Sequence, residues 1–478
     1  MRIRYKVSIF LIFITSLLLV IILAPRQSFE VIVYTLFILY TIWGIYHLIL
    51  LIHGLSKPFD PLAKAALSRH PHPYPYPYPY PYPYPKISMI IPVRQEPILS
   101  RTIETCLLNT DYPMHKKEVV VVTEDEDMAR IALYYQQRYP ENVKILMRKN
   151  YFPTKPSALN DALALCTGEI IGIVDAEDIV EVDLLKKVAS AIVDHGYDTV
   201  QVMLRIGNVE DGWILLLFAM EYAGWFRIWL NARSKLRVYT PLGGTGNYIS
   251  REALVEVGGW DPTNLAEDAE LAIRLMLSNK SICLIDARQW EEAPTTFKAW
   301  LKQRTRWYRG WLQSLWKYMP IMLKISTARR IGLVNVITTI FMLIAPLIVM
   351  LNYIAYSFTI LWLLEEFNIL ASSITTDLFP SFALIPLLFN IIYYSTLFKG
   401  ALKEGIRCKG LDPLLAFVYM NIMMPIAVSR AVYQCIFKDV FWEKTKHEGR
   451  GVRWVYKESK ESKESKESKE KDAYPPLG

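Results

Sequence analysis

The chain has 478 residues, of which 52% are hydrophobic and 21% charged, and its formal net charge is +8. This apolar balance excludes a purely water-soluble protein and predicts one large soluble domain joined to a membrane part. Basic residues gather near the ends of apolar segments, which favours contact with anionic lipid and makes a nucleic-acid partner unexpected. The five cysteines show neither zinc-site nor disulfide spacing, which indicates reduced structural thiols.

Two N-terminal segments, 7–24 and 31–52, contain no Asp, Glu, Lys or Arg. Each is long enough to cross a bilayer as a helix, so residues 1–56 are expected to form two transmembrane helices. A cleaved signal peptide is the alternative for the first segment, because Arg2, Arg4 and Lys6 precede it. The same basic residues place the N-terminus in the cytosol, and two crossings return the chain to that side. We therefore expect a multi-pass protein of the cell membrane whose polar domain is cytosolic.

Residues 57–85 form a predicted linker that contains alternating Tyr-Pro pairs. This composition favours an extended polyproline II spacer between membrane and domain. A docking site for a partner with an aromatic groove is the alternative.

Short β-rich runs alternate with segments of helical periodicity between residues 86 and 325. The strand candidates are 87–92, 119–122, 143–147, 170–174 and 199–203. Such alternation predicts an α/β domain with a mostly parallel sheet and helices on both faces. Ligands then bind beyond the carboxyl ends of the strands.

Residues 326–440 are expected to form a second membrane region, with apolar stretches at 331–364, 378–398 and 414–437. The first stretch fits one tilted helix or two short ones, and the third, interrupted by Pro425, either crosses once or turns back. Residues 441–478 include a Lys-Glu-Ser repeat without apolar side chains, which predicts a charged, disordered tail.

Carboxylates follow two of the predicted elements. Asp175, Glu177 and Asp178 come directly after the strand at 170–174, where they would offer the oxygen ligands that a hard divalent cation requires. Glu267 and Asp268 precede a predicted helix at 269–277. The alternatives are a solvated acidic turn for the first group and a charge partner of the helix N-terminus for the second.

Two further motifs lie in the same domain. Residues 241–247 contain three glycines, which permits either close approach of a ligand to the backbone or an ordinary turn. Gln303 and Arg306 are three residues apart on a predicted helix, hence on nearly the same face, and Trp307 is adjacent. An aromatic and basic belt at the membrane interface is the alternative for this helix.

The order of these motifs resembles that of the membrane-integrated family 2 glycosyltransferases, of the cellulose, chitin and hyaluronan synthase type, over roughly residues 86 to 315. The resemblance implies a GT-A (Rossmann-like) domain flanked by transmembrane helices. It also implies inverting transfer of a sugar from a nucleotide-sugar donor, most simply a UDP-sugar. The run at 175–178 resembles the DxD motif with Glu177 in place of the second Asp. Asp175 with Glu177 or Asp178 would then hold Mg²⁺ or Mn²⁺.

The resemblance also assigns the remaining donor contacts. Pro92 and Glu96 belong to the first-strand signature, and Glu124, with Asp125 as the alternative, would contact the uracil. Lys155 would contact the nucleotide or a phosphate. Asp175 would contact the nucleotide-sugar through the bound metal.

Asp268 is the implied catalytic base, because a carboxylate must accept the proton of the attacking hydroxyl. Glu267 and Glu270 are secondary candidates for that role. The implied contacts are the pyrophosphate for Gln303 and Arg306, and the acceptor for Gly244, Thr245, Gly246 and Trp307.

The expected partners are a nucleotide-sugar donor, a glycan or lipid-linked acceptor, and membrane lipids, while the oligomeric state stays open. Extension and export of a polysaccharide follow from the likeness at residues 303–307. Transfer of one sugar to a polyprenyl phosphate or another lipid is the nearest alternative. An inactive membrane scaffold is the third.

Overall fold

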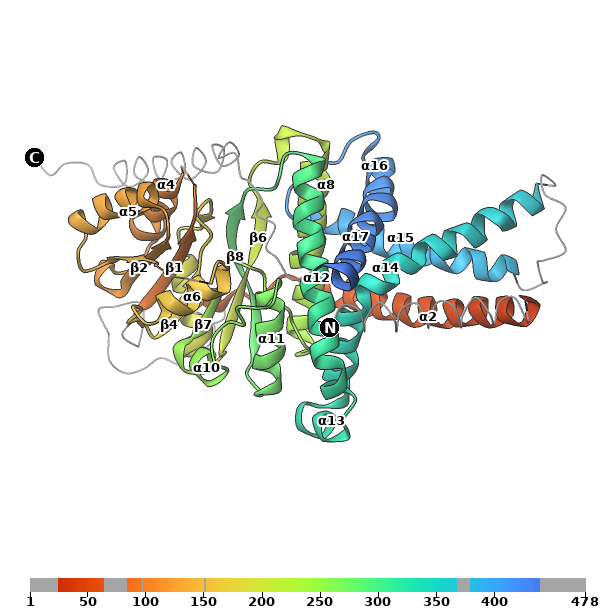
Figure 1. Cartoon of the computed structure of the whole chain (residues 1–478), viewed down its shortest axis with the longest axis horizontal. Coiled ribbons are helices and arrows are strands. Elements are labelled where there is room, and N and C mark those ends of the chain that lie inside the picture. The colour runs from red at the N-terminus through yellow and green to blue at the C-terminus, as the bar shows by residue number, and fades with distance from the viewer. Residues whose placement is uncertain (1–24, 64–83, 97, 150–151, 368–378, 439–478) are drawn as a thin grey trace, which may run out of the picture.

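The computed structural model describes residues 25–63, 84–96, 98–149, 152–367 and 379–438. The expected first span at 7–24, most of the Tyr-Pro spacer and the charged tail lie outside these residues. Figure 1 shows a sheet domain covered by helices, with a group of long helices extending from one end of it.

Eight strands form one sheet in the order β3-β2-β1-β4-β7-β6-β8-β5. Parallel pairing joins β3, β2, β1 and β4 and also joins β6 to β8, whereas β7 runs antiparallel to both of its neighbours and β5 runs antiparallel to β8. The predicted α/β fold with a mostly parallel sheet is therefore confirmed. The strands are β1 (Ile87–Val93), β2 (Lys117–Thr123), β3 (Val143–Met147), β4 (Ile170–Ile173), β5 (Ile179–Val180), β6 (Thr199–Ile206), β7 (Asn247–Ser250) and β8 (Ile282–Glu291).

Alternate side chains of the central strands enter two hydrophobic cores, one on each face of the sheet. Ile91 and Val121 belong to the first core and Ile90 and Val120 to the second. The first core includes residues of α4 (Leu99–Glu104), α5 (Glu126–Arg138) and α7 (Leu184–Ala189). The second includes residues of α6 (Lys155–Leu163), α10 (Arg251–Glu256) and α11 (Glu267–Leu277).

An apolar helical run at 213–235 joins the sheet domain to the long helices. It consists of α8 (Trp213–Tyr222), the π-helical η5 (Ala223–Leu230) and α9 (Asn231–Lys235). The long helix α12 (Phe297–Met322) contacts this run through an ion pair between Arg304 and Glu221, and the short α13 (Ile325–Ile331) follows α12. The group that extends from the domain contains α2 (Pro25–Gly54), α14 (Leu333–Glu366), α15 (Phe379–Lys403), α16 (Asp412–Val418), the π-helical η6 (Tyr419–Met423) and α17 (Met424–Phe437).

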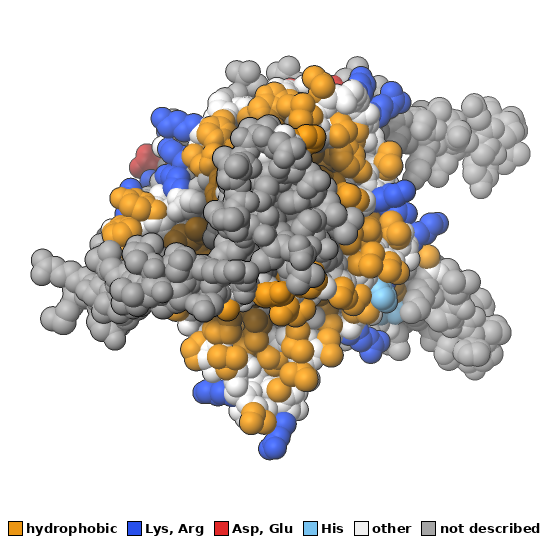
Figure 2. All heavy atoms as spheres, turned by 90° about the vertical axis from the view of Figure 1, so that its right-hand side faces the viewer, with side chains coloured by type: hydrophobic (Ala, Val, Ile, Leu, Met, Phe, Trp, Pro, Cys, Tyr) orange, Lys and Arg blue, Asp and Glu red, His pale blue; other side chains and the backbone are white. Residues whose placement is uncertain are grey.

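Four helical segments among the described residues are long and apolar enough to cross a membrane: Tyr34–Gly54, Trp213–Lys235, Leu333–Leu351 and Asp412–Phe437. Ile38, Ile42, Ile45 and Ile49 of α2 are about half exposed, whereas Tyr40, His47 and Leu50 on its other side are buried. Figure 2 shows hydrophobic side chains gathered over this end of the molecule, with Lys and Arg toward its margins. Such a surface suits contact with lipid chains.

The structure shows how two of the apolar stretches are built as helices and changes one expectation. The stretch at 331–364 forms one helix, α14, with Pro346 inside it, and the stretch at 414–437 lies within one continuous helical run. The linker expected at 57–85 is not wholly a spacer. Its first residues pack on the domain, since the Phe59 carbonyl accepts a hydrogen bond from the Asp286 amide at 2.7 Å.

Candidate active site

The carboxyl ends of β1, β2 and β4 lie at one edge of the sheet because these strands are parallel and adjacent. Pro92, Glu96, Glu124 and Asp175 stand at or just after these ends, and all four line one cavity of about 510 Å³. The structure thus brings together residues that are up to 83 positions apart in the sequence (92 and 175).

Glu124 and Asp125 follow the same strand but have different surroundings. Asp125 caps α5, since its carboxylate accepts a hydrogen bond from the Asp127 amide at 2.9 Å. Glu124 lines the cavity and lies 3.3 Å from Arg94 Nε. The geometry therefore favours Glu124 over Asp125 as a ligand contact.

The acidic run at 175–178 divides into cavity and core residues. Asp175 and Glu177 line the cavity, whereas Asp178 is fully buried and does not. Asp178 Oδ2 accepts hydrogen bonds from the Asp175 amide at 2.9 Å, the Thr245 hydroxyl at 2.6 Å and Gln289 Nε2 at 2.6 Å. Asp178 therefore fixes the turn that presents Asp175.

These carboxylates repel one another in a poorly solvated place. Burial, together with the charges of Asp175 and Glu96, raises the pKa of Glu177 well above its usual range. Burial and the Asp175 charge do the same to the pKa of Asp178. A cation would relieve this repulsion, so the donor set fits a hard divalent metal held by Asp175 and Glu177.

No group of three His, Cys, Asp or Glu side chains in the described part of the chain is arranged to hold a metal. Two carboxylates from the chain suit a Mg²⁺-type site that substrate phosphates and water complete. The residues present are therefore compatible with a metal that arrives with a nucleotide.

Lys155 begins α6 and reaches across the cavity. Its ammonium group forms an ion pair with Asp175 and donates a hydrogen bond to the Gly244 carbonyl at 2.9 Å. Burial alone would lower the pKa of Lys155, but the Asp175 and Glu267 carboxylates outweigh that effect and raise it. Lys155 therefore stays charged and can bind a phosphate.

The glycine-containing loop contributes Gly244 and Thr245 to the cavity, but not Gly246. Gly246 has φ +64°, and a Cβ atom on it would lie 2.7 Å from a Leu204 methyl and 2.8 Å from a Val202 methyl. The geometry thus places Gly246 against the core behind the loop, not at the position expected for an acceptor contact. Its conformation and close packing explain the glycine.

Glu267 and Asp268 form the first turn of α11, and both line the cavity. Asp268 Oδ1 accepts a hydrogen bond from the Ala269 amide at 2.7 Å. A Cβ atom on Gly244 would lie 3.6 Å from Asp268 Oδ2 and 3.8 Å from Lys155 Nζ. Asp268 and Lys155 therefore flank the bare backbone of Gly244 on the cavity wall.

The two adjacent carboxyl groups titrate as a coupled pair. Burial and the Asp268 charge raise the pKa of Glu267 to about 7. Burial raises the pKa of Asp268, while its bond to the Ala269 amide and the charges of Lys155 and Arg306 oppose the increase. A carboxylate with a raised pKa is a stronger base, which suits proton abstraction.

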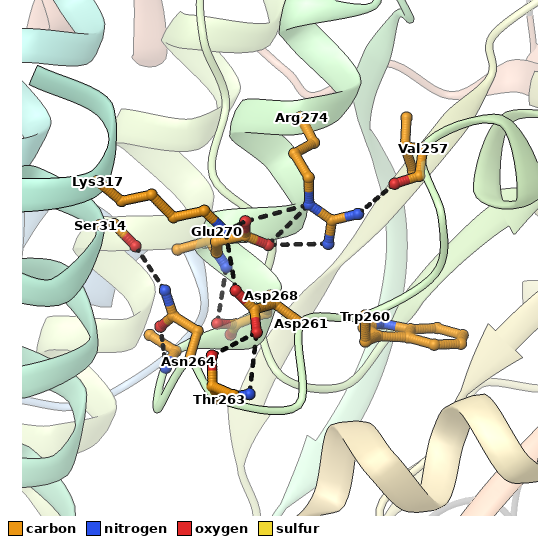
Figure 3. A network of polar contacts seen from close by, with 12 residues as sticks. Val257, Trp260, Asp261, Thr263, Asn264, Asp268, Glu270, Arg274, Ser314 and Lys317 are labelled. Carbon is orange, nitrogen blue, oxygen red and sulfur yellow. Dashed lines mark hydrogen bonds and ion pairs between the residues drawn. The ribbon is translucent and has the colours of Figure 1, made fainter. Parts of the chain in front are cut away.

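Glu270, a secondary candidate for the base, faces away from the cavity and has a structural role. Its fully buried carboxylate accepts hydrogen bonds from Arg274 Nε at 2.9 Å, Lys317 Nζ at 2.7 Å and the Tyr318 hydroxyl. Figure 3 shows Lys317 reaching from α12 toward Glu270 and Asp261. This network holds α11 against α12 and so sets the position of the carboxylates at the start of α11.

Gln303, Arg306 and Trp307 lie on α12 and line the cavity, as their spacing predicts. Arg304, between them, also lines the cavity but is held by an ion pair. Its guanidinium forms two hydrogen bonds to the Glu221 carboxylate, at 2.8 and 2.7 Å, and lies 4.2 Å from the Phe218 ring centroid. Trp300 and Arg304 of the same helix are buried within the protein, whereas Trp316 is exposed.

Sequence reasoning misses the far end of the cavity. Beyond Trp307 the wall is formed by α2, α14, α15 and the run at 213–235. The lining residues there include Tyr40, Tyr46, His47, Trp229, Arg233, Met342, Ile348 and Tyr393. Their hydrophobicity predicts only membrane helices, because nothing in the sequence pattern reveals that these helices enclose a space continuous with the acidic edge of the sheet.

Comparisons with known proteins agree with this geometry. Residues 85–310 match the model of a family described as "Glycosyltransferase like family 2". A "Probable glycosyltransferase YdaM" of Bacillus subtilis is 28% identical over 250 residues, covering 51% of this chain and 59% of that protein. A "Beta-monoglucosyldiacylglycerol synthase" of Trichormus variabilis is 29% identical over 248 residues, covering 50% and 51%. The matches span only about half the length of these relatives.

The fold is similar to that of a solved structure, the mannosyltransferase PcManGT from Pyrobaculum calidifontis in complex with GDP-Man and Mn²⁺. The TM-score is 0.50 at 17% sequence identity, with 84% of this chain and 99% of the other covered. The likeness supports the GT-A fold for this chain.

Proposed function

We propose that the protein is a family 2 glycosyltransferase that transfers one sugar from a nucleotide-sugar donor to a lipid acceptor at a membrane, a proposal supported by the match of residues 85–310 to that family's model. One observation carries the proposal: a single cavity joins the acidic edge of the sheet to the apolar helices α2 and α14. A polar donor and a lipid would meet at Asp268 in that space. Relatives named for a diacylglycerol acceptor support this choice.

In the proposed reaction the nucleotide lies beside Pro92 and Glu124, with its diphosphate near Lys155. A Mg²⁺ or Mn²⁺ ion held by Asp175 and Glu177 would offset the charge of the leaving diphosphate. The charged side chain of Lys155, which contacts Asp175, would support the same group.

Asp268 accepts the proton of the acceptor hydroxyl as that oxygen attacks the anomeric carbon. One base and one displacement invert the configuration, and no covalent intermediate forms on the protein. Arg306 contributes positive charge next to this base, since its charge acts on both Glu267 and Asp268.

Extension of a polysaccharide is the second candidate function. The arrangement of Gln303, Arg306 and Trp307 on the cavity wall favours this function. An indole ring next to two hydrogen-bonding side chains suits stacking on the terminal sugar of a growing glycan. This reading requires the apolar end of the cavity to pass a glycan.

The test uses the purified full-length protein in lipid vesicles with Mn²⁺ and a panel of radiolabelled UDP-sugars and GDP-mannose. We expect one donor to yield a single lipid-linked product, whereas a ladder of sizes would favour the polysaccharide synthase. Asp268→Asn should lower kcat by about 10² to 10⁴ and leave nucleotide binding unchanged. Transfer that survives this substitution would refute the assignment of the base, and failure with every donor would favour an inactive scaffold.

A further inference from the structure

Three hydrogen-bond donors at the apolar end of the cavity have no hydrogen-bond partner within the described residues. They are the Tyr46 hydroxyl, Trp229 Nε1 and Arg233 Nη1, which we call the donor cluster. The exposed fractions of these residues are 9%, 6% and 1%, and all three line the cavity. Buried donors are normally paired, so three unpaired donors around one space indicate a missing acceptor.

Arg233 is the strongest member of the donor cluster because it carries a charge. Its Nε donates to the Tyr239 carbonyl at 2.6 Å and its Nη2 to the Thr338 carbonyl at 3.2 Å. The rings of Tyr46 and Tyr239 lie 5.8 and 5.7 Å from its guanidinium carbon. Neutral groups thus surround the cation in the described part of the chain. A buried charge without a counter-ion is strongly unfavourable, so an anionic ligand would stabilise this site.

The chemistry of the donor cluster selects the anion. An arginine guanidinium with hydroxyl and indole donors matches the oxygens of a phosphate group. The lining residues nearby, including Tyr40, Met342 and Ile348, are largely apolar. They suit contact with the hydrocarbon chains of a lipid.

The donor cluster is close to the proposed base. Tyr239 joins the two, because its carbonyl accepts the hydrogen bond from Arg233 while its hydroxyl donates to the Ala269 carbonyl at 3.0 Å, one residue after Asp268. A phosphate bound at Arg233 is therefore separated from the reaction centre by about one tyrosine side chain.

We propose that the donor cluster binds the phosphate group of a phosphate-bearing lipid acceptor that carries the attacking hydroxyl elsewhere in its headgroup, with the lipid chains lying against α2 and α14. This inference rests on the proposed function and narrows its acceptor from any lipid to an anionic one. A diacylglycerol, named for the cyanobacterial relatives, carries no such group.

The experiment measures binding without a donor, so it does not depend on turnover. The full-length protein in neutral detergent is titrated with a polyprenyl phosphate, the matching polyprenol, phosphatidic acid, diacylglycerol and inorganic phosphate, and the thermal midpoint and Kd are recorded. We expect the phosphate-bearing lipids to bind at least about tenfold more tightly than their uncharged counterparts. Inorganic phosphate binding as tightly as the lipids would overturn the lipid assignment.

Arg233→Gln should abolish this discrimination, and Arg233→Lys should retain part of it. Arg237→Gln is the matched control, because Arg237 is exposed four residues further on. Nucleotide binding, measured for UDP and GDP, should be unchanged in all variants and reports that the domain is folded. Discrimination that persists in Arg233→Gln would refute the inference.

Failure of this inference and failure of the proposed function give different results. Transfer to diacylglycerol without any phosphate preference would leave the proposed function intact and overturn the donor cluster. Binding of phosphate lipids through Arg233 without transfer of any sugar would support the donor cluster and overturn the proposed function.

Discussion

Gly310 of α12 offers a sharp test of how the proposed catalytic carboxylates, Glu267 and Asp268, are positioned. A Cβ atom on Gly310 would lie 2.8 Å from the Leu265 carbonyl carbon and closer still to the backbone nitrogen and the Cβ of Ala266. These backbone atoms immediately precede Glu267 and Asp268. Because ordinary contact begins near 3.4 Å, Gly310→Ala requires α12 and the start of α11 to separate by about 1 Å.

The expected result is a loss of catalysis with little loss of stability. A displacement of about 1 Å at a reacting group can lower the rate about 100-fold, equivalent to about 2.7 kcal/mol in activation free energy. Overpacking costs about 1 to 3 kcal/mol of stability, and the higher helix propensity of alanine offsets up to about 1 kcal/mol of it. The variant should therefore fold and bind nucleotide.

The assay compares kcat, KM for the donor and nucleotide Kd for the parent, Gly310→Ala and Gly212→Ala. Gly212 is the control because its backbone is extended and a Cβ atom there meets nothing within 4 Å. A kcat for Gly310→Ala within about twofold of the parent would refute the reasoning. A parallel loss of nucleotide binding would also contradict it, because the predicted displacement is confined to the base.

Three further outcomes follow from the buried charges. Arg304→Met should lower the free energy of unfolding by about 3 to 5 kcal/mol, because Glu221 is left buried and unpaired. Adding Glu221→Gln should restore part of that stability, as measured by urea unfolding. If the double variant instead loses the sum of the two single losses, the prediction is contradicted. Because the folded-state pKa of Glu267 is raised from 4.5 to about 7, the parent loses stability as pH rises through that window. Glu267→Gln should remove this loss, as urea unfolding between about pH 5 and 8 would show, and a parallel pH profile for parent and variant would refute the shift. A chelator should abolish sugar transfer, and added Mn²⁺ should restore it. Glu177→Gln should raise the Mn²⁺ concentration for half-maximal activity at least about tenfold. The control Asp127→Asn, at an exposed residue, should leave that concentration unchanged.

The sequence predicts the first half of the sheet better than the second. Its first four strand candidates match β1 to β4 closely, since β-branched and other apolar residues predominate in each of these short segments. β7 escapes detection because Asn247–Ser250 is short and only two of its residues are apolar. β8 escapes because Asp286, Arg288 and Gln289 interrupt its pattern, although Gln289 is fully buried and bonds to Asp178.

Side-chain direction explains which site residues the sequence could and could not assign. Asp175 and Asp178 look equivalent in the sequence, but only the fold turns one toward the cavity and the other into a hydrogen-bond network. The sequence does not single out Arg233, because the evidence for its proposed role is that Nη1 has no hydrogen-bond partner within the described structure. Such an absence is visible only when the surroundings of every donor are known.

Helix α12 links the chemistry of the sheet domain to the helices beyond it. Its residues Gln303 and Arg306 line the cavity, Gly310 contacts the backbone before the proposed catalytic carboxylates, and Lys317 binds Glu270 of α11. The same helix contacts α17, where Arg309 donates to Gln434 at 3.2 Å. One rigid element therefore sets both the position of the base and the wall along which a lipid would enter.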